Sequence, residues 1–160
     1  MSNPLKINKF HVPEEGMQFD SAISAEFLGL PVSDRETGYS SLKMAAHLSM
    51  LDNLQTMIVR GSGELEMTCH CDRCYDEYTE FLPIEEICHV IENCPDIIDL
   101  TESVREDILL SFPQHYLCGD DCLGLCPGCG KNLNREGCSC SDLEESSSAL
   151  DVLDGLKFEE

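Results

Sequence analysis

Three runs of residues in the middle of the chain have the hydrophobic and polar pattern of β-strands. They cover residues 42–51, 54–68 and 78–91, and the second and third contain several β-branched or aromatic side chains. In the second run Leu65 and Met67 fall on one face, while the residues beside them are charged or hydroxylated. Asp52 and Asn53 suit a hairpin turn between the first two runs. The pattern predicts an antiparallel meander with one solvated face.

The segment 99–112 has the pattern of an amphipathic helix. Its apolar positions recur every four residues, at Val104, Ile108 and Phe112. Asp99 precedes Glu102 by three residues, which is the spacing of a capping box. We expect this helix to pack on one face of the meander and to carry its acidic side chains in solvent.

The segments before the meander have weaker patterns. Residues 5–10 predict a short strand, and residues 31–39 predict an exposed loop because turn formers and charges dominate there. Residues 17–29 are mixed, with helical spacing at Phe19, Ile23 and Phe27. The fold class expected is α+β: an antiparallel β-meander packed by a helix, with a C-terminal cysteine-rich zinc-knuckle module.

Three parts of the chain differ in composition. We expect residues 1–117 to form the α+β domain, residues 118–140 to form a metal-binding module, and residues 141–160 to form an acidic tail. The tail begins with a serine-rich linker and has a possible short helix at 149–158.

Cysteine supplies the candidate chemistry. Six of the 11 cysteines lie in residues 118–140, and a further Cys-x-x-Cys lies between the second and third predicted strands. Paired cysteines presented on tight turns are typical zinc ligands. Knuckle pairs combine two by two, so we expect two ions. The first group is Cys71, Cys74, Cys118 and Cys122, and the second is Cys126, Cys129, Cys138 and Cys140.

Zinc is the metal that this spacing favours first, and iron is the alternative, because both accept four thiolates. A thioredoxin-like redox pair is disfavoured for Cys71 and Cys74, since such a pair sits at a helix N-terminus after a parallel strand. For His70, which lies beside the first pair, and for His115 we expect ordinary exposed or packed side chains; ligation by His70 and contacts of His115 around the metal ligands are the alternatives.

The charge of the chain is strongly acidic and uneven. Residues 1–62 carry seven acidic and five basic side chains, and residues 63–160 carry 24 acidic and five basic ones, giving net charges of −2 and −19 and a total of −21. Affinity for nucleic acid comes largely from lysine and arginine, so we expect little direct binding to naked RNA. A basic protein is the better partner.

Other functional classes lack support in the sequence. No phosphate-binding glycine loop and no nucleophile in a recognisable setting are present, so we expect no enzymatic activity and no small-molecule substrate. No run approaches the ~20 apolar residues of a membrane helix, and the N-terminus has no apolar signal core, so we expect a cytoplasmic protein without membrane contact.

An ordered set of motifs carries a family resemblance. In order these motifs are Cys71-x-x-Cys74, Ile98-Asp99-Leu100, Leu110-Ser111-Phe112-Pro113, Gly124-Leu125-Cys126-Pro127, Gly130-Lys131-Asn132-Leu133-Asn134 and Cys138-x-Cys140. Over about residues 56–140 the chain resembles the YceD family. The resemblance implies a role in the accumulation of large-subunit (23S) ribosomal RNA. Together with the acidic charge, this process leads us to expect a ribosomal protein, a large-subunit assembly factor or the pre-ribosome as partner. Ser148 to Asp151 stand where a basic segment is common in that family.

Two classes of function remain open. The first is a non-catalytic factor for ribosome biogenesis that binds its partner through a zinc-stabilised acidic surface. The second is a thiol-based redox regulator or metal-responsive regulator. Tight stoichiometric zinc with protected thiols favours the first, and rapidly cycling thiols favour the second.

Overall fold

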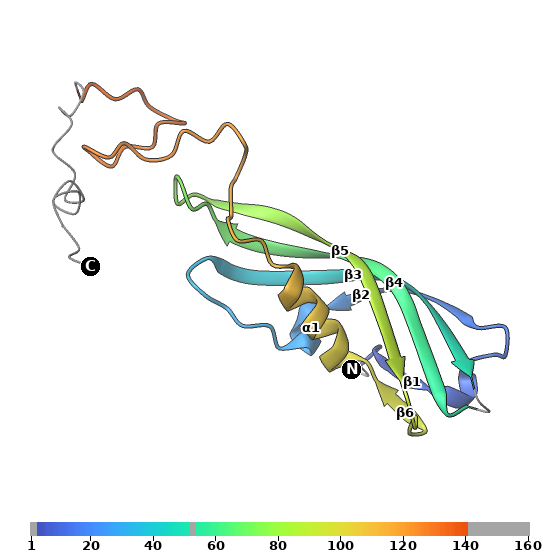
Figure 1. The fold of residues 1–160 in the computed structure, drawn as a ribbon. Helices are drawn as coiled ribbons and strands as arrows, with labels where there is room; N and C mark the ends of the chain where they lie inside the picture. Colours follow the sequence, from blue (N-terminus) through green and yellow to red (C-terminus); the bar gives the residue numbers. More distant parts are fainter. Residues whose placement is uncertain (1–2, 52–53, 141–160) are drawn as a thin grey trace, which may run out of the picture.

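A computed structural model describes residues 3–51 and 54–140 of the chain (Figure 1). Its elements in chain order are β1 (Lys6–Asn8), the 3-10 helix η1 (Lys9–His11), β2 (Met17–Ser24), the 3-10 helix η2 (Ala25–Leu28), β3 (Glu36–Leu51), β4 (Thr56–His70), β5 (Glu77–Ile91), β6 (Ile97–Asp99) and α1 (Thr101–Ser111). The hairpin turn predicted at Asp52 and Asn53 and the short helix predicted at 149–158 lie outside the described residues.

The main sheet is an antiparallel meander in the order β2-β3-β4-β5. Strands β3, β4 and β5 are 16, 15 and 15 residues long, and they form a long twisted sheet in Figure 1. A second, two-stranded sheet pairs β1 with β6. The predicted fold class, an antiparallel meander with one helix, is confirmed.

Buried side chains alternate with more exposed ones along the strands, and the buried ones form the core. In β4, Met57, Val59, Leu65 and Met67 are fully buried, and the positions between them point to the other face of the sheet. Strand β3 follows the same rule from Leu42 to Met50. One face of the meander therefore carries the hydrophobic core, and the other is solvated as predicted.

Helix α1 covers part of the core face, against β5 and η2 (Figure 1). Val104 and Ile108 are 1% and 0% exposed, and the ring of Phe112, just after the helix, stacks on Tyr39 with the centroids 6.2 Å apart. The predicted apolar stripe is confirmed. The predicted capping box is wrong, because the Asp99 carboxylate accepts a hydrogen bond from the Thr101 N–H while Glu102 pairs with Arg105.

Two predictions for the N-terminal part need correction. The mixed segment 17–29 begins with a strand, since Met17–Ser24 pairs along its whole length with β3, and only the following Ala25–Leu28 is helical. The predicted loop 31–39 ends earlier than expected. Glu36 to Tyr39 already belong to β3, which is paired to the end of β4 through two irregularities of register.

In the part of the chain that the structure describes, no helix is long and apolar enough to cross a membrane.

Candidate metal centre

The tip of the β4–β5 hairpin presents the first pair of cysteines. Strand β4 ends at His70 and β5 begins at Glu77, so Cys71 and Cys74 lie in the turn between them. The Cys71 carbonyl accepts a hydrogen bond from the Tyr75 N–H, and the Arg73 N–H points at the Cys71 sulfur at 3.4 Å. This turn directs both sulfurs to the same side of the hairpin, where Cys71 and Cys74 are almost fully buried.

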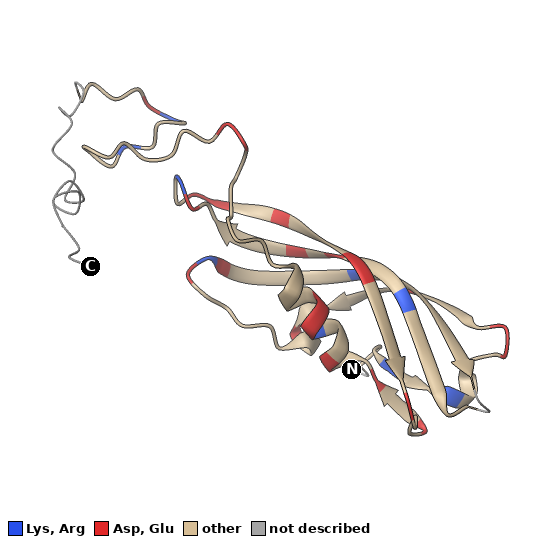
Figure 2. Cartoon of the chain, in the orientation of Figure 1, with Lys and Arg blue, Asp and Glu red and all other residues tan. Residues whose placement is uncertain are grey.

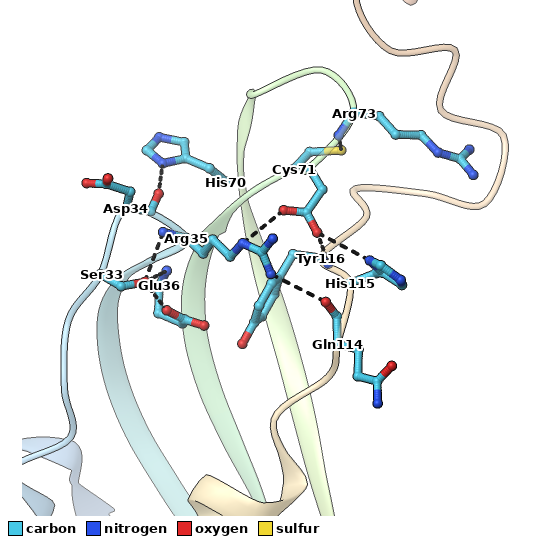
Figure 3. Close-up of polar contacts among 11 residues, drawn as sticks. Ser33, Asp34, Arg35, Glu36, His70, Cys71, Arg73, Gln114, His115 and Tyr116 are labelled. Atoms are coloured by element: carbon cyan, nitrogen blue, oxygen red, sulfur yellow. Dashed lines mark hydrogen bonds and ion pairs between the residues drawn. The ribbon is translucent and has the colours of Figure 1, made fainter. Parts of the chain in front are cut away.

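The segment after α1 returns to this hairpin tip and is fixed there by Asp72. The Asp72 N–H donates to the Tyr116 carbonyl at 2.8 Å, and the Tyr116 N–H donates to the Asp72 carboxylate at 3.0 Å. The same carboxylate pairs with the Arg35 guanidinium, which also donates to the Gln114 carbonyl; Figure 3 shows Arg35 reaching Gln114 beside Tyr116. These bonds fix the chain after α1 at Tyr116, two residues before Cys118.

Site 1 consists of Cys71, Cys74, Cys118 and Cys122, whose sulfurs all lie within 4.8 Å of one another. The Cys71 and Cys122 sulfurs are 3.8 Å apart, and those of Cys74 and Cys118 are 3.7 Å apart. Four sulfurs held about 2.3 Å from one zinc ion in a tetrahedron are about 3.8 Å apart, so the donor set fits a four-thiolate ion. The distances are far longer than a disulfide of about 2 Å, and all four thiols are free.

Site 2 consists of Cys126, Cys129, Cys138 and Cys140, and its sulfurs also lie within 4.8 Å of one another. The Cys138 sulfur is 3.3 Å from that of Cys126 and 3.5 Å from that of Cys129. Gly130 has a φ of +71°, and its N–H donates to the Cys126 carbonyl, which closes the knuckle turn. The structure thus forms the same two groups that the sequence predicts, and metal binding by them stays a prediction.

The electrostatics of each group require a cation if all four thiols are to ionise. Burial opposes ionisation of Cys71, but N–H donors of Cys118, Cys74 and Arg73 lower its pKa to about 6. Burial, together with the neighbouring thiols of Cys122 and Cys74, raises the pKa of Cys118 to about 12. Each group therefore favours one thiolate and resists the next, and a divalent ion at the centre would supply the missing positive charge.

Site 2 has the same division between a favoured and a disfavoured thiolate. Hydrogen bonds from the Cys129 N–H, the Cys138 thiol and the Gly128 N–H lower the pKa of Cys126 to about 6. The Cys138 and Cys129 thiols beside Cys140 raise its pKa to about 12. The two sites differ in exposure: Cys129 and Cys140 are exposed, whereas only Cys118 is exposed in site 1.

The two sites are in contact through the loop that joins the ligand pairs of site 2. The Asn132 side chain donates to the Asp76 carboxylate at 2.8 Å, and Arg135 forms an ion pair with the same carboxylate. The Asn134 amide donates to the Cys122 sulfur of site 1 at 3.3 Å. The sequence did not predict these contacts of Asn132 and Asn134, because contacts with site 1 depend on a fold that the sequence pattern does not give.

A glycine allows the module to approach the hairpin tip. Gly124 has a φ of +76°, and a Cβ there would lie 3.0 Å from the Arg73 carbonyl oxygen. The adjacent Leu125 N–H donates to that same carbonyl at 3.0 Å. The backbone of the module therefore lies directly against the turn that carries Cys71 and Cys74.

The remaining candidates lie outside the two groups. The His70 ring stacks on Tyr75, with centroids 4.6 Å apart, and its Nδ1 contacts the Asp34 carbonyl (Figure 3). His70 is therefore not a member of the four-cysteine group. His115 contacts Asp72 at 3.9 Å and is largely exposed. Cys88, in β5, is also outside the two groups, and its thiol is exposed.

The fold of the described residues and the cysteine groups define a class: a small α+β protein in which residues 3–51 and 54–140 form a four-stranded meander, one α-helix and two four-cysteine groups that could hold metal ions. Residues 85–157 match the family model described as large ribosomal RNA subunit accumulation protein YceD. The resemblance to the YceD family is therefore confirmed over this range, which includes α1 and six of the eight clustered cysteines. No curated protein and no solved structure gives a significant match to the chain.

Proposed function

We propose that this protein is a non-catalytic factor that supports the accumulation of large-subunit ribosomal RNA during ribosome biogenesis. In this proposal two zinc ions stabilise the fold, and an acidic surface binds a basic ribosomal protein or a large-subunit assembly factor. The match of residues 85–157 to the YceD family carries the proposal, because it names the process and includes both ligand pairs of site 2.

The use of the basic side chains supports a protein partner over naked RNA. Nine of the 10 lysines and arginines lie in the described ranges, and seven of these nine form ion pairs with Asp or Glu. Another, Arg73, donates to the carbonyls of Asp120 and Cys122. Most described lysines and arginines therefore already pair with a carboxylate or a backbone carbonyl of the same chain, while Asp and Glu are spread over the ribbon (Figure 2).

Zinc ions at both sites fit this role as structural ions. Four-thiolate sites are closed to a catalytic water, and they fix chain segments that lack a hydrophobic core. At site 1 the ligands come from the hairpin tip and from the segment after α1, 44 or more positions apart. An ion there would tie the helix exit to the sheet.

The process is tested by depleting the protein in its source cells and measuring both ribosomal RNAs. We expect the large-subunit RNA to fall relative to the small-subunit RNA. Restoration by the wild-type gene, and failure of restoration by a variant lacking site 1 ligands, would connect the process to the metal centre. An unchanged ratio of the two RNAs in depleted cells contradicts the proposed function.

The partner is tested with the purified, zinc-loaded chain. Crosslinking in ribosome gradients should place the protein on large-subunit precursors and join it to a basic protein. Naked large-subunit RNA should bind weakly at physiological salt, because few cations are free to neutralise phosphates. Nanomolar affinity for naked RNA under those conditions contradicts the protein-binding mechanism and leaves the process untouched.

The exposure of site 2 favours one alternative, a regulator that responds to oxidants or metal supply. Cys129 and Cys140 are exposed, and thiolates that solvent reaches are the ones that oxidants modify first. Thiol titration of the zinc-loaded protein separates the two functions. Eight protected thiols with two retained zinc ions support the structural role, and two rapidly oxidised and re-reduced thiols with zinc release support the regulator.

A further inference from the structure

The loop between the ligand pairs of site 2 also lines site 1. Residues 130–137 connect Cys129 to Cys138, so an ion at site 2 would close this loop at both ends. Within the loop, the Asn134 side-chain oxygen accepts from the Leu123 N–H at 2.8 Å. Its amide nitrogen donates to the Asn132 side-chain oxygen at 3.0 Å and to the Cys122 sulfur at 3.3 Å. Asn134, in the loop between the ligand pairs of site 2, thus contacts the proposed ligand Cys122 of site 1.

Further contacts hold this loop against the hairpin that carries the other ligands of site 1. The Leu133 N–H donates to the Gly124 carbonyl at 2.9 Å. The Asn132 amide and the Arg135 guanidinium both bind the Asp76 carboxylate, at 2.8 and 3.0 Å. Asp76 lies two residues after Cys74, and its carbonyl accepts from the Cys71 N–H. The loop therefore bridges both halves of site 1, the hairpin turn and the Cys118–Cys122 segment.

A hydrogen-bond donor beside a metal-bound thiolate stabilises its negative charge. A four-thiolate site around one divalent ion has a net charge of −2, so each N–H that points at a sulfur lowers the cost of collecting four thiolates. Residues of this kind orient the ligands, and their loss costs roughly 10- to 100-fold in metal affinity. Asn134 has the chemistry and the distance for this role.

We infer that Asn134 is a positioning residue for site 1, and that an ion at site 2 raises the metal affinity of site 1 by fixing the loop that carries Asn134. The inference rests on the two-ion part of the proposed function. It makes the two sites a coupled pair in which site 2, whose ligands are close in sequence, orders the loop, and site 1 then closes between distant segments.

The first test measures the metal affinity of site 1 in the full chain by chelator competition, with Co(II) absorption following each ion. The Cys74→Ser variant lacks site 1 and identifies its signal. Asn134→Asp keeps the acceptor for Leu123 and removes the donor, while Asn134→Ala removes the donor without adding charge. We expect both to weaken site 1 by roughly 10- to 100-fold. Lys131→Gln, an exposed change in the same loop, is the matched control and should leave the affinity unchanged.

The spectrum separates positioning from a general effect on folding. Loss of an N–H donor to a thiolate changes the energy of its charge transfer to Co(II), so the charge-transfer band of site 1 should shift in both Asn134 variants and not in Lys131→Gln. Weakened affinity with an unshifted band would assign Asn134 to loop folding alone. If only Asn134→Asp weakens site 1, the repulsion of the new carboxylate explains the result, and the hydrogen bond contributes nothing.

The coupling is tested by a double-mutant cycle. The variant with Cys129→Ser and Cys138→Ser lacks site 2 and should bind metal at site 1 more weakly than wild type. Adding Asn134→Ala to it should have little further effect, because the two changes remove the same support. Additive losses would show that site 2 does not act through Asn134. A wild-type chain that binds no metal would instead contradict the proposed zinc sites themselves.

Discussion

Ile108 offers a direct test of how the helix is joined to the sheet. Its side chain is fully buried, one turn after the buried Val104, on the face of α1 that contacts β5 and η2. Truncating a buried isoleucine to alanine removes about 2 to 5 kcal/mol of stability. Domains have a net stability of about 5 to 15 kcal/mol, so Ile108→Ala should remain folded and Ile108→Asp, which adds a buried unpaired carboxylate, should not.

The magnitude is measured as a melting temperature in reducing buffer with zinc. One kcal/mol corresponds to about 2 to 4 °C in a chain of this length, so Ile108→Ala should melt about 4 to 20 °C below wild type. Ile108→Asp should show no cooperative transition. Leu110→Asp is the matched control, because Leu110 lies on the same helix and is 86% exposed; its stability should change by about 0.5 kcal/mol at most.

Two outcomes would refute the reasoning. If Ile108→Asp melts at the wild-type temperature, α1 does not belong to the core. If Ile108→Asp and Leu110→Asp lower the melting temperature equally, the added charge on the helix, and not burial of the side chain, explains the loss.

Three further predictions follow from the structure. Cys74→Ser and Cys129→Ser should each lower the zinc content from two ions to one at saturating zinc. Only Cys74→Ser should strongly lower the melting temperature, because site 1 joins distant segments. A wild-type content of one zinc ion would contradict this prediction. Gly61→Ala should destabilise the sheet by about 1 to 3 kcal/mol, since a Cβ would lie 2.2 Å from the Ala45 carbonyl oxygen, while Gly38→Ala, with nothing within 4 Å, should have little effect in the same urea titration. Brief alkylation of the zinc-loaded chain should modify Cys88 first, and mass spectrometry that finds a proposed ligand modified equally fast would count against its coordination.

The parts of the fold that the sequence predicted are those in which a local pattern and the tertiary environment agree. The three long strands and the helix have apolar positions at the correct period, and those positions are buried. In β2 the periods do not discriminate, because Phe19 and Ile23 are four apart and share a face in either a helix or a strand. The start of β3, with Glu36 and Gly38, has no strand pattern of its own and is extended by its pairing with β4.

The candidate site, too, has parts that could be predicted from the sequence and parts that could not. The spacing of cysteines within each pair, and the short connection between the two pairs of site 2, are properties of the sequence alone. Site 1 was predictable only because two pairs remained after site 2 was closed. The bond from Asn134 to Cys122 was not predictable, since it depends on how closely the module approaches the hairpin, which Gly124 permits and no periodic pattern records.

The position of the family match bears on what the sheet contributes to the site. The matched range begins at residue 85, inside β5, and therefore contains both pairs of site 2 but only Cys118 and Cys122 of site 1. The other two thiols come from the β4–β5 hairpin, whose turn stays in place because β4 is paired on both sides, with β3 and with β5. A fragment limited to the matched range would keep the ligands of site 2 and lack half the ligands of site 1. The long meander is thus a scaffold for half of a candidate metal site, and the Asp72 contacts to Tyr116 bring the other half to it.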